Sequence, residues 1–247
     1  MKKIILFIVC ISLLTACDNW YSTNSPDKSS TGTGGSTARF VCKGNYLYVV
    51  DEQNLSSYDI ADSSKIELKS RQSVGGLMET IFPTDSLLFM GSTSGMYIYN
   101  LKKPYNPAYI SQYNHLTSCD PVVVQGKYAF VTLHSSSDVW SCSRNVNELQ
   151  VIDISDIRNP IQKNSYTMVN PKGLSIDGNR LFICDGMDLV VMDASNPLEM
   201  NELKRMEMDG TPYDLIARNG LLTVTYSAGI KQYSYDGDTI QQLSVIY

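Results

Sequence analysis

Five copies of one short pattern constrain the fold of this chain more than any other feature. Each copy holds two apolar runs, and the first runs read YLYVV, LLFMG, YAFVT, RLFIC and LLTVT, starting at Tyr46, Leu87, Tyr128, Arg180 and Leu221. Their starts lie 41, 41, 52 and 41 residues apart. A period of about 41 residues is typical of propeller blades and of helical arrays.

The chemistry of the runs favours strands over helices. They are short, rich in Val, Ile, Tyr and Phe, and bounded by Gly-Asn, Asp-Gly and Asn-Pro pairs, which are strand and turn signals. One further run precedes each pair and another follows it. We therefore predict an all-β chain forming a single five-bladed β-propeller, with four antiparallel strands per blade and the sheets arranged radially in a closed ring.

The N-terminus differs in composition from the repeats. Two lysines precede the run IILFIVCISLL, which is too short to span a bilayer and is typical of a secretory signal peptide. The residues LTAC, ending at Cys17, resemble a bacterial lipobox, where the chain is cut before a cysteine that receives a lipid. We expect a signal peptide over residues 1–16 and a lipid on Cys17 that anchors the protein to the outer membrane or the cell surface.

Three regions follow from this composition. Ser, Thr, Gly and Asn dominate the residues after Cys17, so 17–37 is predicted to be the lipidated cysteine and a flexible tether. The propeller is predicted over 38–247, with blades at about 38–74, 75–116, 117–168, 169–208 and 209–247. The net charge of −5 argues against a nucleic-acid partner.

The second runs carry a recognisable motif. LQVIDIS from Leu149, LVVMDAS from Leu189 and the degenerate MYIYNLK from Met96 resemble the LVIVD repeat of bacterial and archaeal surface proteins. The resemblance is strong in units three and four, fair in two, and weak in one and five. It implies a propeller at the cell surface and no particular reaction. The polar residues that end these runs are predicted to accept backbone N–H groups two positions on and so begin a turn; they are Asp59, Asn100, Asp153 and Asp193.

The cysteines and one insertion mark the third unit. Cys119 and Cys142 should lie on the same face of that blade, and we predict a disulfide between them because the compartment is oxidising. Cys42 and Cys184 fall in strands and are interpreted as small buried apolar residues. Trp140 lies in the insertion, where it serves either as a recognition residue or as packing over the blade edge.

Charged residues gather where the inner strands begin. Alignment of the five units places Ala38, Glu79, Asp120, Lys172 and Tyr213 in one column, and Arg39, Thr80, Pro121, Gly173 and Asp214 in the next. These positions are predicted to line the mouth of the central channel with charges of both signs. The mouth is then either a solvated, neutralised entrance or a functional site.

Two functional classes compete for this mouth. The first is a lipid-anchored binding or scaffolding module that docks a protein or glycan through Arg39, Glu79, Asp120, Lys172, Asp214 and Trp140. The second is a glycoside hydrolase that uses Glu79, Asp120 and Asp214 as its carboxylates. With only two histidines, no phosphate loop and no nucleophile motif, we expect no metal site and no cofactor. We favour a monomeric binding module over an enzyme.

Overall fold

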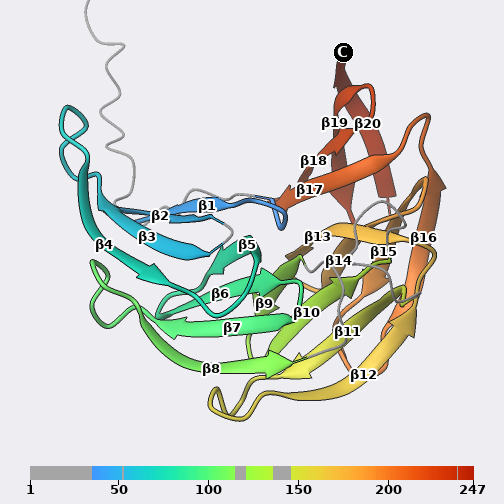
Figure 1. Ribbon diagram of the computed structural model, residues 1–247. Coiled ribbons are helices and arrows are strands. Elements are labelled where there is room, and N and C mark those ends of the chain that lie inside the picture. The colour runs from blue at the N-terminus through green and yellow to red at the C-terminus, as the bar shows by residue number, and fades with distance from the viewer. Residues whose placement is uncertain (1–34, 52, 115–120, 136–145, 238) are drawn as a thin grey trace, which may run out of the picture. The chain divides into compact units, whose positions relative to one another are not determined.

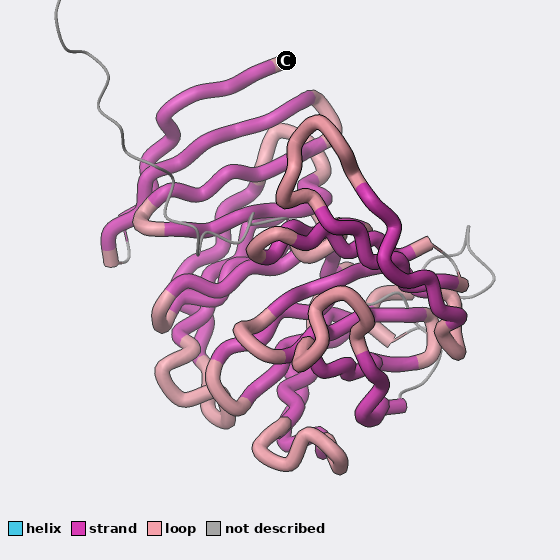
Figure 2. Tube along the Cα trace, turned by 90° about the vertical axis from the view of Figure 1, so that its left-hand side faces the viewer, coloured by secondary structure: helices cyan, strands magenta, loops and turns pink. Residues whose placement is uncertain are grey.

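The computed structural model confirms the five-bladed prediction. It describes residues 35–247 except 52, 115–120, 136–145 and 238. The strands of this part form five sheets of four antiparallel strands each, and every sheet follows chain order (Figures 1 and 2). In the part of the chain that the structure describes, no helix is long and apolar enough to cross a bilayer.

Each sheet is one blade, and its first strand is the inner one. Blade 1 holds β1 (Phe40–Lys43), β2 (Tyr46–Val50), β3 (Asn54–Asp59) and β4 (Glu67–Ser73). Blade 2 holds β5 (Met78–Pro83), β6 (Leu87–Ser92), β7 (Gly95–Asn100) and β8 (Ala108–Asn114). Blade 3 holds β9 (Val122–Gln125), β10 (Tyr128–Leu133), β11 (Glu148–Asp153) and β12 (Ile161–Thr167). Blade 4 holds β13 (Pro171–Asp177), β14 (Arg180–Asp185), β15 (Asp188–Asp193) and β16 (Asn201–Glu207), and blade 5 holds β17 (Pro212–Arg218), β18 (Leu221–Tyr226), β19 (Gly229–Asp236) and β20 (Thr239–Ile246).

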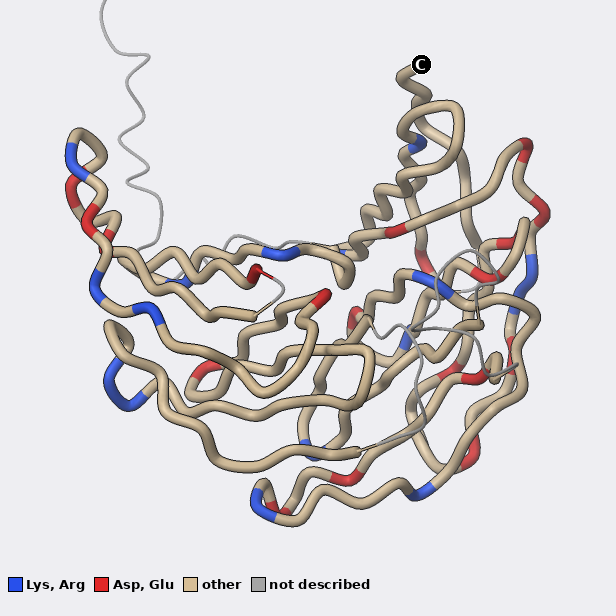
Figure 3. The backbone as a smooth tube through the Cα atoms, in the orientation of Figure 1, with Lys and Arg blue, Asp and Glu red and all other residues tan. Residues whose placement is uncertain are grey.

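The hydrophobic core lies between consecutive blades. Strands β6, β7, β9 and β10 contain no charged residue, because strands sandwiched between two sheets bury both faces. Charged residues concentrate instead at turns and on outer strands such as β4 and β16 (Figure 3). Between blades 3 and 4, for example, Phe130 and Val151 pack with Leu181 and Ile183. Each blade is therefore stabilised mainly by its neighbours.

The predicted turn chemistry is confirmed in four blades. The side chains of Asp59, Asn100, Asp153 and Asp193 each accept the backbone N–H two residues later, at 3.0, 3.3, 2.9 and 3.0 Å. This contact fixes the turn between the third and fourth strands without help from the rest of the fold.

These turns make stability sensitive to acid. Hydrogen bonds from Ser155, from Asn159 and from the Ser195 N–H hold the pKa values of Asp153, Asp156 and Asp193 below the usual aspartate value. A depressed folded-state pKa stabilises the protein above the unfolded value of about 3.9, and the contribution is lost as pH falls through the folded-state value. We expect the free energy of unfolding to be level from pH 7 to 5 and to fall below about pH 4.

Urea unfolding at pH 7, 5, 4 and 3 measures this effect. An Asp153→Asn/Asp193→Asn variant is the control, because it should lose less stability on acidification than the unmodified chain. Stability that rises below pH 4 would contradict the assignment.

The two end blades do not close the ring as expected. Consecutive blades contact one another through their inner strands, such as β1 with β5 and β13 with β17. Among the described residues, no comparable contact between strands joins blade 5 to blade 1. Strands β11 and β15 are buried along their central residues, whereas β19 alternates between buried and partly buried positions. Blade 5 is thus covered on one face only.

Candidate functional site

The inner strands begin with a β-bulge that positions the predicted mouth residues. The pairing register skips Glu79 in β5, Lys172 and Gly173 in β13, and Tyr213 in β17. A bulge bends the strand and redirects the side chain of the extra residue. Glu79, Lys172 and Tyr213 therefore occupy equivalent points in their blades.

Asp214 holds the segment before blade 1 against blade 5. Its carboxylate accepts hydrogen bonds from the N–H and Oγ of Ser36, at 3.1 and 3.0 Å, and from the N–H and Oγ1 of Thr37, at 3.2 and 2.7 Å. The buried Ser36 Oγ also accepts the Leu174 N–H of blade 4, at 2.8 Å. These contacts, which we call the Asp214 clasp, join the start of blade 1 to blades 4 and 5.

The clasp requires a close approach of β13 to β17. A Cβ atom on Gly173 would lie 2.6 Å from the Asp214 Cα atom and would also overlap the Asp214 carboxylate. Only glycine fits this point, because any side chain would force the two inner strands apart. The Asp214 carboxylate therefore holds the segment of Ser36 and Thr37 against blade 5.

Lys172 and Tyr213 lie together at the mouth. The Lys172 ammonium is 4.8 Å from the centroid of the Tyr213 ring, a cation–π contact. Burial lowers the pKa of Lys172, and the nearby Cys184 partly opposes this shift. No carboxylate of the described part pairs with this ammonium. Tyr213 is 46% exposed, so the mouth presents a cation beside an open aromatic ring.

Two exposed apolar residues border this pair. Val169, just before β13, is 65% exposed, and Met187, in the turn between β14 and β15, is 47% exposed. Thr211, two residues before Tyr213, donates from Oγ1 to the Met187 Sδ at 3.3 Å. We call Val169, Lys172, Met187 and Tyr213 the blade 4–5 surface.

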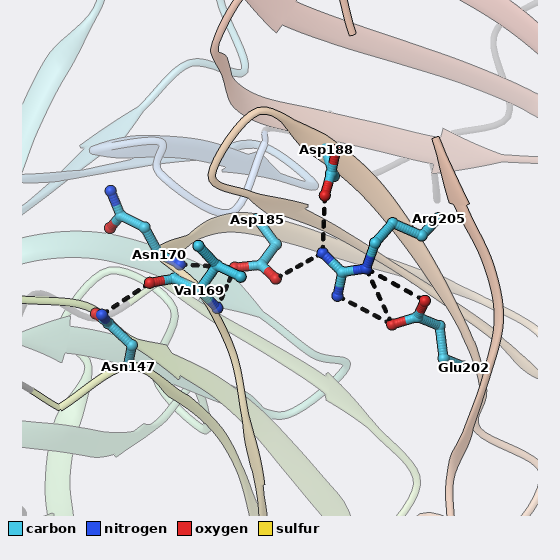
Figure 4. Close-up of polar contacts among 7 residues, drawn as sticks. All are labelled: Asn147, Val169, Asn170, Asp185, Asp188, Glu202 and Arg205. Carbon is cyan, nitrogen blue, oxygen red and sulfur yellow. Dashed lines mark hydrogen bonds and ion pairs between the residues drawn. The ribbon is translucent and has the colours of Figure 1, made fainter. Parts of the chain in front are cut away.

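A buried carboxylate fixes the backbone beneath the blade 4–5 surface (Figure 4). Asp185 is fully buried and accepts the N–H groups of Val169 and Asn170, at 2.9 and 2.8 Å. Its second oxygen accepts the Arg205 guanidinium at 3.1 Å, and the Asn147 amide donates to the Val169 carbonyl at 2.8 Å. Both backbone polar groups of Val169 are thus satisfied, which holds its exposed side chain in one place.

Comparison with known families decides what these repeats are. Residues 34–73, 144–168 and 170–207 match the family of the LVIVD repeat. The chain carries LVIVD repeats. The matches in the third and fourth units confirm the sequence prediction. The first unit matches in full although its resemblance was expected to be weak, and the second, expected to be fair, falls outside the matched residues.

Solved structures share the fold of this LVIVD-repeat propeller. The periplasmic gluconolactonase PpgL of Pseudomonas aeruginosa has a TM-score of 0.64 at 13% identity, over 82% of this chain and 67% of its own. A functionally unknown protein from Desulfotomaculum acetoxidans gives 0.68 at 12%, over 87% and 68%. BamB of Moraxella catarrhalis gives 0.57 at 10%, over 83% and 56%. No curated protein matches significantly. At such identities these likenesses show the fold alone.

The hydrogen-bonded cluster around Asp185 was not predicted, although the spacing between its aspartate and its arginine recurs in the sequence of this LVIVD-repeat propeller. Asp185 and Arg205 are 20 residues apart, and so are Asp51 and Arg71 of blade 1, which form an ion pair of 2.8 Å. Asp51 also accepts the N–H groups of Gln53 and Asn54, at 3.0 and 2.8 Å. An aspartate at the end of the second strand or just after it, with an arginine 20 positions later, is thus a readable signal for this ion pair.

The remaining predicted residues have different outcomes. Arg39 is exposed and pairs with no described carboxylate, and Glu79 is half-buried on β5. Cys184 is buried as predicted, whereas Cys42 is only partly buried because it lies on the uncovered face of blade 1. Cys17, Cys119, Asp120, Trp140 and Cys142 lie outside the described residues, so the lipid site, the disulfide and the insertion remain predictions. Within the described ranges, no group of three or more His, Cys, Asp or Glu residues is placed to hold a metal ion.

A groove of about 510 Å³ lies at the opposite end of the inner strands. The turns between β5 and β6 and between β9 and β10 line it, with Phe82 and Phe89 as its aromatic walls. The carboxylate of its wall residue Asp85 already lies 3.5 Å from the Lys43 ammonium. We therefore place the candidate site at the blade 4–5 surface, where the cation lacks such a partner among the described residues.

Proposed function

We propose that this LVIVD-repeat propeller is a lipid-anchored binding module of the bacterial envelope that docks a protein partner on the blade 4–5 surface. The observation that carries the proposal is the Lys172 ammonium over the exposed Tyr213 ring. The exposed Val169 lies three residues before Lys172, and the exposed Met187 is contacted by Thr211, two residues before Tyr213. The signal peptide and the lipobox resemblance at Cys17 support the anchor and the location.

The chemistry of the surface favours a protein partner with an apolar side chain next to a carboxylate. Contiguous exposed apolar residues mark interaction sites, and tyrosine is enriched among the residues that dominate binding energy. A carboxylate would pair with Lys172 and exclude partners that present a cation there. Because Asp185 already fixes the Val169 backbone, docking costs little backbone entropy at this residue.

The hydrolase alternative has no comparable support. It needs Asp214 as one of three carboxylates, and the Asp214 carboxylate already accepts four hydrogen bonds from Ser36 and Thr37. A catalytic role would require this carboxylate to exchange those bonds for substrate. Binding is therefore the function that we propose.

The test is recovery of partners from the native envelope after mild cross-linking. A full-length Lys172→Ala/Tyr213→Ala variant should recover the partner at least about ten-fold less well, because a cation and an aromatic anchor together contribute about 2 kcal/mol. The matched control is Lys127→Ala/Tyr105→Ala. Lys127 lies 5.3 Å from the Tyr128 ring centroid at the opposite end of an inner strand, and Tyr105 is also 46% exposed.

Equal recovery by both variants would overturn the docking assignment. A polysaccharide array run in parallel distinguishes the alternative ligand class, because binding of acidic glycans that is lost in the same variant would replace the protein partner with a glycan.

A further inference from the structure

The inter-blade faces of this protein are apolar on both sides of each contact. On blade 4, the residues that face blade 5 include Phe182, Cys184, Leu189 and Val191, all buried. The residues that face blade 3 include Leu181, Ile183, Val190 and Met192, which are also buried. Both faces of a blade that lies between two others therefore consist of buried apolar side chains.

The free face of blade 5 is polar at the central positions of β18 and β19, although Leu221, Ile230 and Ile246 also lie on it. The pairing register places Thr223 opposite Gln232 and Thr225 opposite Ile230, the positions that hold Phe182, Val191, Cys184 and Leu189 in blade 4. Three of the four apolar residues are thus replaced by Thr or Gln. Terminal repeats of repeat proteins commonly carry a polar outer face of this kind, which keeps the end soluble.

The free face of blade 1 is apolar instead. Leu47, Val49 and Tyr58 occupy the positions that Leu181, Ile183 and Met192 hold in blade 4, and Ser56 stands at the position of Val190, so three of the four positions remain apolar. Phe40 and Cys42 pair with Val49 and Leu47 and lie on the same face. Phe40 is 61% exposed, whereas Tyr48 and Val50 on the opposite face are fully buried against blade 2. One apolar sheet face therefore lacks a sheet against it among the described residues.

The side chains on the free faces of blades 1 and 5 indicate which surface can cover the free face of blade 1. Blade 5, of this chain or of a copy, offers Thr223, Thr225 and Gln232, which do not replace the apolar cover found between other blades. A second copy does offer one matching surface, namely its own blade 1 face. We propose that two copies of this chain pair through the free faces of their blade 1 sheets, related by a two-fold axis.

The charges and size of the face fit such a contact. Lys65 and Lys69 on its rim form ion pairs with Glu67, and Lys69 also with Asp59, so no block of like charge meets its copy. Four strands about 4.8 Å apart, each of about six residues rising 3.3 Å, give a face of about 19 by 20 Å. This is about half the area per partner of a standard stable interface, so we expect a weak dimer that dissociates on dilution. The proposal replaces the expectation of a monomer and does not depend on the docking function.

Analytical ultracentrifugation of the full-length chain between 1 and about 200 μM tests the proposal. The unmodified chain should shift from monomer to dimer over this range, and Val49→Lys should weaken the dimer at least ten-fold by burying a charge in the contact. Thr223→Lys is the matched control, since it places the same charge on the free face of blade 5 and should leave the dimer unchanged. Phe40→Ser, at the most exposed apolar position of the face, should weaken the dimer even if Val49→Lys does not fold.

Cross-linking at Cys42 gives a second readout. In a background with Cys10, Cys17, Cys119 and Cys142 all replaced by Ser, a bismaleimide should join two copies through Cys42, because the remaining Cys184 is buried. Phe40→Ser should lower the yield of this species. A monomer at all concentrations, a dimer that neither substitution weakens, or cross-links from Cys42 to another protein alone would overturn the proposal.

Discussion

Replacing Phe182 by alanine is expected to lower the free energy of unfolding by about 3–5 kcal/mol. The Phe182 side chain is fully buried in the cluster between blades 4 and 5, and its ring centroid is 4.7 Å from that of Tyr235. Its removal loses the transfer free energy of the ring and leaves a cavity that rigid neighbouring sheets cannot fill. Urea unfolding at pH 7 measures the change.

The control is the same position one blade later. Thr223→Ala, 41 residues further on, should change the free energy of unfolding by less than about 0.5 kcal/mol because none of the five described sheets packs on it. A loss of similar size at both positions would mean that the outer face of blade 5 is covered as the face of blade 4 is, and the open-ring description would then be wrong.

Replacing Asp214 by alanine is expected to cost about 2–4 kcal/mol, since it leaves the N–H of the buried Ser36 without its acceptor and also removes the hydrogen bonds from the Ser36 Oγ, from Thr37 and from the Leu215 N–H. The melting temperature should fall by roughly 5–15 °C for a chain of this size. Hydrogen exchange should also accelerate at the amides of Ser36, Thr37 and Leu174. Thermal unfolding and exchange followed by mass spectrometry measure the two effects.

Asp193→Ala is the comparison for this variant. Asp193 accepts one backbone N–H in an exposed turn and lies 3.7 Å from the Arg180 guanidinium, so its loss should lower the melting temperature much less than the loss of Asp214. If Asp214→Ala left the exchange of Ser36 unchanged and instead abolished partner recovery, Asp214 would belong to a ligand site and the clasp would be secondary.

The sequence predicts the blades because the signals that specify them are local. A strand pair with its turn is a short segment, such as residues 180–193 for β14 and β15. The aspartates that cap the third-strand turns, such as Asp153 and Asp193, need partners only two residues away. The column of Glu79, Lys172 and Tyr213 is recovered for the same reason, since each residue lies at a fixed offset from its own second strand.

The clasp and the open ends could not be predicted in this way. Ser36 and Asp214 are 178 positions apart, and neither residue has a neighbour in the chain that signals the other. The polar face of blade 5 was readable in principle, because Thr223 and Gln232 stand where blade 4 has Phe182 and Val191. The number of strands shows only that each blade is complete. It carries no information on whether another sheet covers the outer face of the first or last blade.

The position of the clasp determines how the propeller bears mechanical load. Ser36 and Thr37 immediately precede β1, so tension arriving along the backbone from the N-terminal side reaches Asp214 before it reaches the first strand. The pull is then shared by four bonds to β17 and one to β13, rather than unzipping β1 from β2 one pair at a time. A molecule held by that end would resist being pulled apart through its last two blades.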